Sequence, residues 1–212
     1  MDEWLAHGLH GEMDYLERNR DKRYDPSVLV PGAQAVVVCL LHFDKSGRDY
    51  HRTVKSLLYK LEAKLKEEFG EKVVSQTHQH IFCDSAPILE RRWCVEAGLG
   101  FIGKNHQLIH PTLGSLLHPG EIVINLPVMT DTTPLPLRGD TEEIPSHVRV
   151  HDGFISVPHS ACAECQLCLQ ACPTGALRNS VWDATQCVAY TTHHCLECQL
   201  VCPYNQHSDC NC

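Results

Sequence analysis

Cysteine spacing near the C-terminal end of the sequence carries the clearest chemical signal. Ten of the 13 cysteines lie between residues 162 and 212, and two runs within this region end in Cys172-Pro173 and Cys202-Pro203. The first run has the spacing C-x2-C-x2-C-x3-C, which is the bacterial ferredoxin pattern for a [4Fe–4S] cluster, and its fourth cysteine ligates a second cluster. We therefore expect two clusters. Their ligands are Cys162, Cys165, Cys168 and Cys202 for the first and Cys187, Cys195, Cys198 and Cys172 for the second.

Two structural zinc sites are the alternative, because eight cysteines can also form two tetrahedra of four thiolates. Zinc ribbons usually use two separated C-x2-C pairs, so they need neither the third closely spaced cysteine nor a proline after each run. The spacing favours iron–sulfur clusters, and zinc stays open as the other interpretation. Two linked clusters relay electrons, so we expect the long part of the chain ahead of them to hold an electron acceptor.

The composition fits a folded protein of a reducing compartment. The chain has 212 residues, of which 43% are hydrophobic and 21% charged, so a sizeable core is feasible. No apolar run reaches the roughly 18 residues of a membrane span, and the start lacks the features of a secretory signal. Without a signal peptide, a dense cysteine cluster indicates metal ligation rather than disulfides. We expect a cytoplasmic monomer with no membrane partner.

The residues ahead of the cysteines alternate between helical and strand patterns. Helical periods cover 3–19 and 50–69, Asp25-Pro26 is expected to cap a short helix, and Gly70 is a suitable helix end. The segment 35–41 is apolar on both faces, which is typical of a central strand with helices on both sides. Further strands are expected at 73–74, 81–83 and 121–126, and a helix capped by Asp84-Ser85 is expected to end at Gly98.

This alternation predicts a layered α/β domain over residues 1–130. A linker or long loop is expected over 131–160, the cluster module over 161–206 and a tail over 207–212. The isolated residues Cys39, Cys83 and Cys94 are expected to be buried apolar thiols. The His207, Cys210 and Cys212 tail could bind a metal, but a frayed terminus is the preferred interpretation.

Several motifs resemble the epoxyqueuosine reductase family. The most specific block has D-S-A-P at residues 84–87, L-E-R at 89–91 and A-G-L-G-F-I-G-K-N at 97–105. Shorter matches lie at 13–18, 23–26, 29–33, 49–51, 114–115, 120–122, 171–176 and 202–205. A chance match of the long block together with the cysteine spacing is very improbable.

The resemblance implies a layered α/β cobalamin-binding domain, nitroreductase-like as in the reductive dehalogenases, followed by a ferredoxin-like module with two [4Fe–4S] clusters. It implies reduction of epoxyqueuosine to queuosine in a tRNA anticodon loop. Electrons would pass from an external low-potential donor through the clusters to cobalamin. The opening oxygen needs a proton, and the family pattern assigns this donation to Asp84. From the residues alone, a helix N-cap is the preferred role of Asp84.

The resemblance also implies contacts to the corrin ring. They are Arg23, His51, Asp84, Asn105, Leu108, His110, Pro119, Ala189, Cys195 and Leu196. By residue type alone, Arg23 can be a surface charge, His51 a capping or core histidine, and Asn105 a left-handed turn residue.

A tRNA partner requires a basic surface, although the net charge of the chain is −8. One stretch concentrates the basic residues Arg18, Arg20, Lys22, Arg23, Lys45, Arg48, Arg52 and Lys55. Ordinary surface charge explains this stretch equally well.

Two other functions stay open. The chain could be a ferredoxin-type electron-transfer protein that binds no cobalamin, or a corrinoid-dependent reductase of a small molecule. Cobalamin binding separates the enzyme from the first alternative, and tRNA affinity separates it from the second.

Overall fold

The computed structural model describes two compact units. The described residues are 1–42, 49–76, 78–126, 149–151, 154–156, 162–178, 181–192 and 195–205. The first unit combines Met1–Arg18, Gly98–Leu116 and Pro134–Cys212, and the second combines Asn19–Ala97 and Leu117–Thr133. Of the residues discussed above, Lys45, Arg48, the tail over 207–212 and most of the segment 131–160 lie outside the described residues.

The units do not follow the consecutive boundaries that composition suggests. In the first unit the start of the chain lies against the cysteine-rich end: the backbone N–H of Ala184 donates to the carbonyl of Leu9 at 2.8 Å. The rings of Trp4 and Trp182 stack with centroids 5.4 Å apart, and Trp4 Nε1 donates to the carbonyl of Trp182 at 2.6 Å. Composition changes along the chain, whereas a compact unit is defined by such contacts between distant segments.

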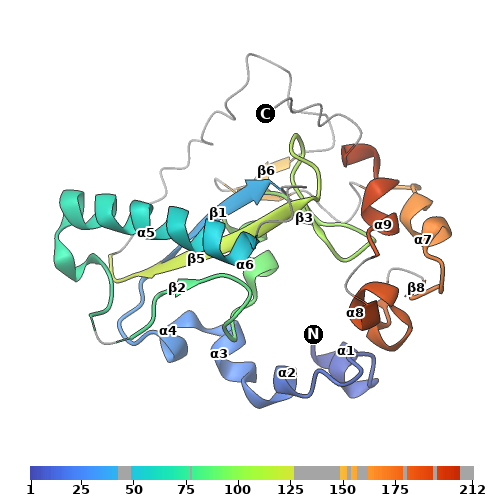
Figure 1. Ribbon diagram of the computed structural model, residues 1–212, viewed down its shortest axis with the longest axis horizontal. Coiled ribbons are helices and arrows are strands. Elements are labelled where there is room, and N and C mark those ends of the chain that lie inside the picture. The colour runs from blue at the N-terminus through green and yellow to red at the C-terminus, as the bar shows by residue number, and fades with distance from the viewer. Residues whose placement is uncertain are drawn as a thin grey trace. The chain divides into compact units, whose positions relative to one another are not determined.

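The second unit is built on an antiparallel sheet of three strands in the order β1-β5-β2. These are β1 (Ala35–His42), β5 (Leu117–Ile124) and β2 (Ile81–Phe82). Figure 1 shows β1 and β5 as two long neighbouring strands, and Val37 pairs with Ile122 in their register. The expectation of a central strand at 35–41 is wrong for the described sheet, because β5 takes the central place by pairing with strands on both sides.

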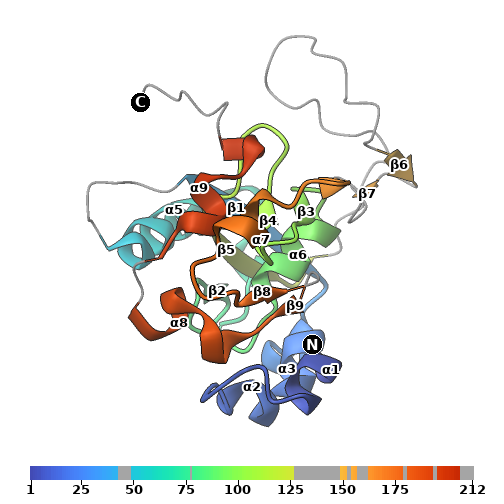
Figure 2. The same ribbon diagram turned by 90° about the vertical axis from the view of Figure 1, so that its right-hand side faces the viewer.

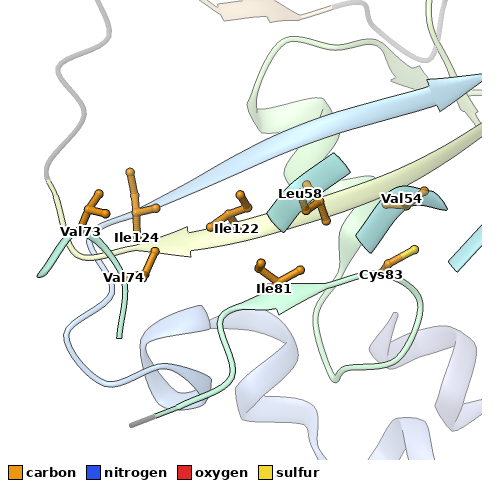
Figure 3. Packing of buried hydrophobic residues seen from close by; sticks show 8 residues of the cluster. All are labelled: Val54, Leu58, Val73, Val74, Ile81, Cys83, Ile122 and Ile124. Atoms are coloured by element: carbon orange, nitrogen blue, oxygen red, sulfur yellow. The ribbon is translucent and has the colours of Figure 1, made fainter. Parts of the chain in front are cut away.

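Helices cover both faces of this sheet, as the sequence predicts. On one face Val54 and Leu58 of α5 (Tyr50–Phe69) pack against Ile122, together with the other core residues drawn in Figure 3. On the other face Val123 packs with a cluster that includes Trp93 of α6 (Glu90–Glu96). Adjacent residues of β5 thus serve opposite faces, which is the two-residue period of a strand.

Local signals set several boundaries in the second unit. Between α3 (Arg20–Tyr24) and α4 (Pro26–Leu29), the Asp25 carboxylate accepts the N–H of Ser27 at 2.8 Å, which confirms the predicted cap. Gly70 ends α5 with φ of +84°, also as predicted. The strand expected at 73–74 is wrong, because Glu71–Val73 form the short 3₁₀-helix η1.

The first unit is made of short elements. Figure 2 shows α7 and α9, which pack against each other, among them. The elements are α1 (Asp2–Ala6), α2 (Tyr15–Arg18), β3 (Phe101–Ile102), β4 (Leu108–Ile109), β6 (Arg149–His151), β7 (Phe154–Ser156), α7 (Leu167–Ala171), β8 (Leu177–Arg178), β9 (Val181–Trp182), η3 (Ala184–Gln186), α8 (Val188–Thr192), α9 (Glu197–Leu200) and η4 (Pro203–Asn205). The continuous helix predicted over 3–19 is broken, because Gly8 and Gly11 adopt φ of +66° and +61°.

None of the described helices combines the length and the apolar character needed to cross a lipid bilayer.

Candidate functional site

A cavity in the first unit brings together four cysteines from two segments. Its volume is about 250 Å³. Three of the thiols come from the start of α7 and the turn before it, and the fourth follows α9. The four cysteines in its wall are Cys162, Cys165, Cys168 and Cys202. This is the set that the crossed ferredoxin pattern assigns to the first cluster.

The remaining cysteines of the module gather around Cys198. Burial raises the pKa of the Cys198 thiol to about 12, and nearby thiolates add to the shift. Those neighbours are Cys195, Cys168, Cys187 and Cys172. The set predicted for the second cluster therefore shares one neighbourhood, and Cys168 of the first set lies close to it.

In the crossed assignment, Cys172 of the first run belongs to the second cluster and Cys202 of the second run belongs to the first. Backbone N–H groups point at each of these two cysteines. Burial opposes ionisation of Cys172, but the N–H groups of Leu177, Thr174 and Ala176 outweigh it, so the pKa of Cys172 is lowered. The N–H groups of Tyr204 and Asn205 act in the same direction on Cys202, although burial dominates there and raises the pKa. Such hydrogen bonds stabilise the thiolate form that an iron–sulfur cluster requires.

The size of the cavity fits a cluster. A single metal ion occupies far less than the roughly 250 Å³ of this cavity, whose wall includes the four cysteines. Across the described residues, no group of three or more His, Cys, Asp or Glu side chains is arranged around one metal ion.

The second unit contains the predicted proton donor, Asp84, which follows β2 after one intervening residue, Cys83. Its backbone has φ of +52°, in the left-handed region, and its side chain is 64% exposed. The hydroxyl of Tyr50 donates to Asp84 Oδ2 at 2.8 Å, and His51 Nε2 lies 3.7 Å from the same oxygen. The N-cap role favoured by the residues alone is wrong, because α6 begins only at Glu90. The carboxyl is therefore held from the first turn of α5 and faces outward.

A second carboxyl, that of Glu90, holds the backbone of Asp84. Its Oε1 accepts the N–H of Asp84 at 2.5 Å. Burial and the nearby Asp84 charge raise the pKa of Glu90 to about 7, although the hydrogen bond itself and the Arg91 and Arg23 charges oppose this. In the sequence, Glu90 stands out only as part of the L-E-R motif, which predicts no contact for it.

A third carboxyl, Glu121, lies in the interior on β5. Its side chain is 0% exposed, and neither carboxylate oxygen has a hydrogen-bond partner among the residues that the structure describes. Burial, with the charges of Glu90 and Asp84, raises its pKa to about 9, so it carries a proton at neutral pH. The signal for this site in the sequence is an acidic residue at the head of an otherwise apolar strand, and no role was predicted for it.

Aromatic contacts fix Tyr50 beside Asp84. Its ring stacks on His118 with centroids 3.8 Å apart and on His51 at 4.0 Å. Burial lowers the pKa of His118, and the neighbouring His51 adds to this, so a neutral imidazole is favoured. The Tyr50 pKa is raised, first by burial and then by its bond to Asp84, so the phenol remains a donor.

The predicted corrin contacts fall into two groups by accessibility. Arg23, Asn105, Leu108 and His110 are buried. His110 Nδ1 accepts the N–H groups of Thr112 and Leu113, and burial lowers its pKa. The accessible group is His51, Asp84, Pro119, Ala189, Cys195 and Leu196.

Burial of the isolated thiols is confirmed for Cys83 and Cys94, whereas Cys39 is only partly buried. Burial raises the pKa of all three, to about 12 for Cys83. They are protonated, unreactive thiols at neutral pH.

Comparison with known proteins finds relatives along nearly the whole chain. No protein-family model matches the sequence. An epoxyqueuosine reductase of Cyclobacterium marinum is 32% identical over 98% of this chain and 70% of its own length. The chain belongs to the epoxyqueuosine reductase family. These relatives are oxidoreductases, and the resemblance inferred from the motifs is confirmed.

Solved epoxyqueuosine reductases share the fold. The Streptococcus thermophilus protein aligns with a TM-score of 0.66 and 20% identity over 96% of this chain. Another epoxyqueuosine reductase, solved with an epoxyqueuosine-modified tRNA-Tyr stem loop, aligns with a TM-score of 0.62 and 24% identity over 88% of this chain. This chain spans 60% and 52% of those two proteins. The mixed α/β architecture predicted from the sequence is therefore confirmed.

Proposed function

We propose that this protein reduces epoxyqueuosine to queuosine in tRNA, with Asp84 as proton donor and electrons supplied through two [4Fe–4S] clusters to cobalamin. Removal of an epoxide oxygen takes up two electrons and two protons, breaks both carbon–oxygen bonds, leaves a carbon–carbon double bond and releases water. When bound, the corrin cobalt would deliver the electrons to the epoxide carbon. The oxygen that leaves needs a proton from the protein, and an accessible carboxyl can provide it.

The observation that carries this proposal is the meeting of Cys202 with Cys162, Cys165 and Cys168 in one cavity. Crossed ligands of this kind are a property of two-cluster ferredoxin modules. The second set, around Cys198, would hold the other cluster. An external low-potential electron donor would reduce the clusters.

The Asp84 site supports the proton-donor role. Tyr50 binds the carboxyl of Asp84 and Glu90 binds its backbone N–H, each by one hydrogen bond. The Asp84 side chain nevertheless stays 64% exposed. A donor that is held in place yet accessible fits proton transfer to a bound substrate. The predicted corrin contacts, accessible and buried, remain part of this proposal.

A tRNA substrate is supported by the relative solved with a modified stem loop. On this chain the basic residues Arg20 and Lys22 of α3 are exposed, as is Arg52 of α5, whereas Arg23 is buried. The exposed cations would contact phosphates, so binding should weaken with salt.

The test is a reconstitution under anoxic conditions. Protein purified without oxygen should contain about eight iron atoms and matching acid-labile sulfide, as two [4Fe–4S] clusters require. After addition of cobalamin it should convert an epoxyqueuosine stem loop to the queuosine form in the presence of a low-potential reductant, as measured by mass spectrometry. The same protein without cobalamin is the control and should show no conversion.

Each alternative has its own result. Zinc in place of iron and sulfide would overturn the cluster assignment. Clusters with no cobalamin binding would favour an electron-transfer protein. Cobalamin binding without affinity for the stem loop would favour a corrinoid-dependent reductase of a small molecule.

A further inference from the structure

Two consecutive residues of the first unit reach both cysteine segments. Lys104 Nζ donates to the carbonyl of Ala163 at 2.6 Å and to that of Cys165 at 3.0 Å. The next residue, Asn105, donates through Nδ2 to the carbonyl of Cys198 at 3.3 Å. One short segment thus holds the backbone of both loops that carry the predicted cluster ligands.

These two residues form the tip of the hairpin between β3 and β4. The strands pair Phe101 with Ile109, and the turn closes by the bond from Gly103 N–H to the Gln107 carbonyl at 3.0 Å. Asn105 is 3% exposed, and its Oδ1 accepts the N–H of Gln107 at 3.2 Å. Both ends of the Asn105 amide are therefore used inside the protein, one for the turn and one for Cys198.

Gly103 allows the hairpin to be this tight. A Cβ built on Gly103 would lie 2.4 Å from Ile109 Cδ1 and 2.9 Å from Asn105 Oδ1. Any larger residue would displace the Asn105 amide. The Gly-Lys-Asn sequence thus has a structural reason at each of its three positions.

Lys104 stabilises a turn in which one residue has an unfavourable backbone conformation. Ala163 adopts φ of +38°, a conformation that non-glycine residues rarely take. The ammonium binds the carbonyl of Ala163 and that of the second cysteine, so it offsets the cost of the turn that brings Cys162 and Cys165 to the same cavity. Lys104 also lines that cavity, and its ammonium lies at the carbonyl of Cys165, one of the four cysteines in the wall.

We infer that Lys104 and Asn105 are positioning residues of the iron–sulfur unit, and that the Lys104 charge raises the reduction potential of the first cluster relative to the second. The inference rests on the clusters of the proposed function. Reduction adds a negative charge to a cluster, and a nearby positive charge stabilises the reduced state. Asn105, which the family resemblance relates to the corrin, would act here on the loop of Cys198.

The experiment is an EPR-monitored redox titration of the anoxically purified full chain. Lys104→Met removes the charge and the donor, Lys104→Gln keeps a donor without the charge, and Lys104→Arg keeps both. Lys60→Met is the matched control, because Lys60 is an exposed cation of α5 in the second unit. Iron and sulfide are counted in every sample.

We expect the potential of the first cluster to become more negative in Lys104→Met and Lys104→Gln, and to stay near the wild-type value in Lys104→Arg and Lys60→Met. Lower iron in Lys104→Met, with full iron in Lys104→Arg, would also support the positioning role. Asn105→Ala should weaken the signal of the second cluster more than that of the first.

Full iron and unchanged potentials in both Lys104→Met and Lys104→Gln would overturn the inference. A shift of equal size in Lys60→Met would do the same, because it would reveal an effect of total charge. Wild-type protein without iron and sulfide would instead defeat the proposed function, so the two failures can be told apart.

Discussion

The hydroxyl of Tyr50 donates a 2.8 Å hydrogen bond to Oδ2 of Asp84. Tyr50 is the first residue of α5, whereas Asp84 follows β2, so the helix and the strand together set the position of the carboxyl. Burial and this bond raise the Tyr50 pKa, which keeps the phenol as a donor across the physiological range. We regard this pair as the part of the second unit that positions the proposed proton donor.

Tyr50→Phe should reduce turnover about tenfold while leaving iron content unchanged. A hydrogen bond to a charged group is worth about 1.5–3 kcal/mol, and part of this fixes the geometry of Asp84. Single-turnover conversion of the stem loop measures the effect. Tyr59→Phe, which removes an exposed hydroxyl of the same helix, should behave as wild type. Equal rates in wild type and Tyr50→Phe would exclude an orienting role for the phenol.

Asp84→Asn should abolish conversion, with a loss of roughly 10²- to 10⁴-fold, because an amide cannot donate the proton. Cobalamin binding and the cluster signals should persist, since Asn has nearly the same shape as Asp. Absorbance titration with cobalamin and EPR provide the readouts. A variant with full activity would remove Asp84 from the mechanism.

Glu90→Leu should also slow conversion, by about tenfold, because the Asp84 N–H loses its acceptor and the left-handed turn loses its support. Glu90→Gln keeps an acceptor oxygen and should retain most of the activity. The pKa of Glu90 is raised to about 7, so its ionisation should contribute to the pH–rate profile of the wild type near that pH. The profile of Glu90→Gln should lack this ionisation. If Glu90→Leu turns over like wild type, the carboxylate does not position Asp84.

Glu121→Gln should make the stability of the protein less dependent on pH. The pKa of Glu121 rises from 4.5 to about 9 on folding, so between these values the folded chain holds a proton that the unfolded chain releases. Below pH 4.5 Glu121 is protonated in both states, so it does not make the free energy of unfolding depend on pH. As the pH rises from 4.5 toward 9, the free energy of unfolding falls because only the unfolded chain releases the proton. The amide removes this loss and should stabilise the protein by on the order of a few kcal/mol at pH 8.

Urea unfolding midpoints between pH 6 and 9 measure this effect. Glu67→Gln, which changes an exposed carboxylate on α5, should follow the wild-type curve. Parallel curves for wild type and Glu121→Gln would show that the buried carboxyl ionises normally.

Exchange of the last cysteine of each run tests the crossed ligands. Cys202→Ser should perturb the first cluster, because Cys202 shares the cavity of Cys162 and Cys165. Cys172→Ser should perturb the second, because Cys172 lies near Cys198. EPR spectra of the two variants should therefore lose different signals. Loss of the same signal in both would contradict the crossed assignment.

Much of the local structure could be predicted from the sequence. The Asp25 cap, the extent of α5 and the strand at β1 depend on residues close together in the chain, and the structure confirms them. The cysteine spacing predicts that Cys202 joins the first run, and the cavity places it there. The motifs between residues 84 and 105, together with the cysteine spacing, indicate the family, and the similarity to its members confirms it.

The tertiary structure alone decided how the site is built. Side-chain periodicity reports on neighbours three or four residues away, so it cannot show that Tyr50 reaches Asp84 or that Lys104 reaches Ala163. It also cannot show that Glu121 is fully buried, because burial depends on which helices cover each face of the sheet. The start of α6 at Glu90 rather than at Asp84 has the same origin: the carboxylate of Glu90 binds the backbone of Asp84 across the turn, and this contact outweighs the local capping preference.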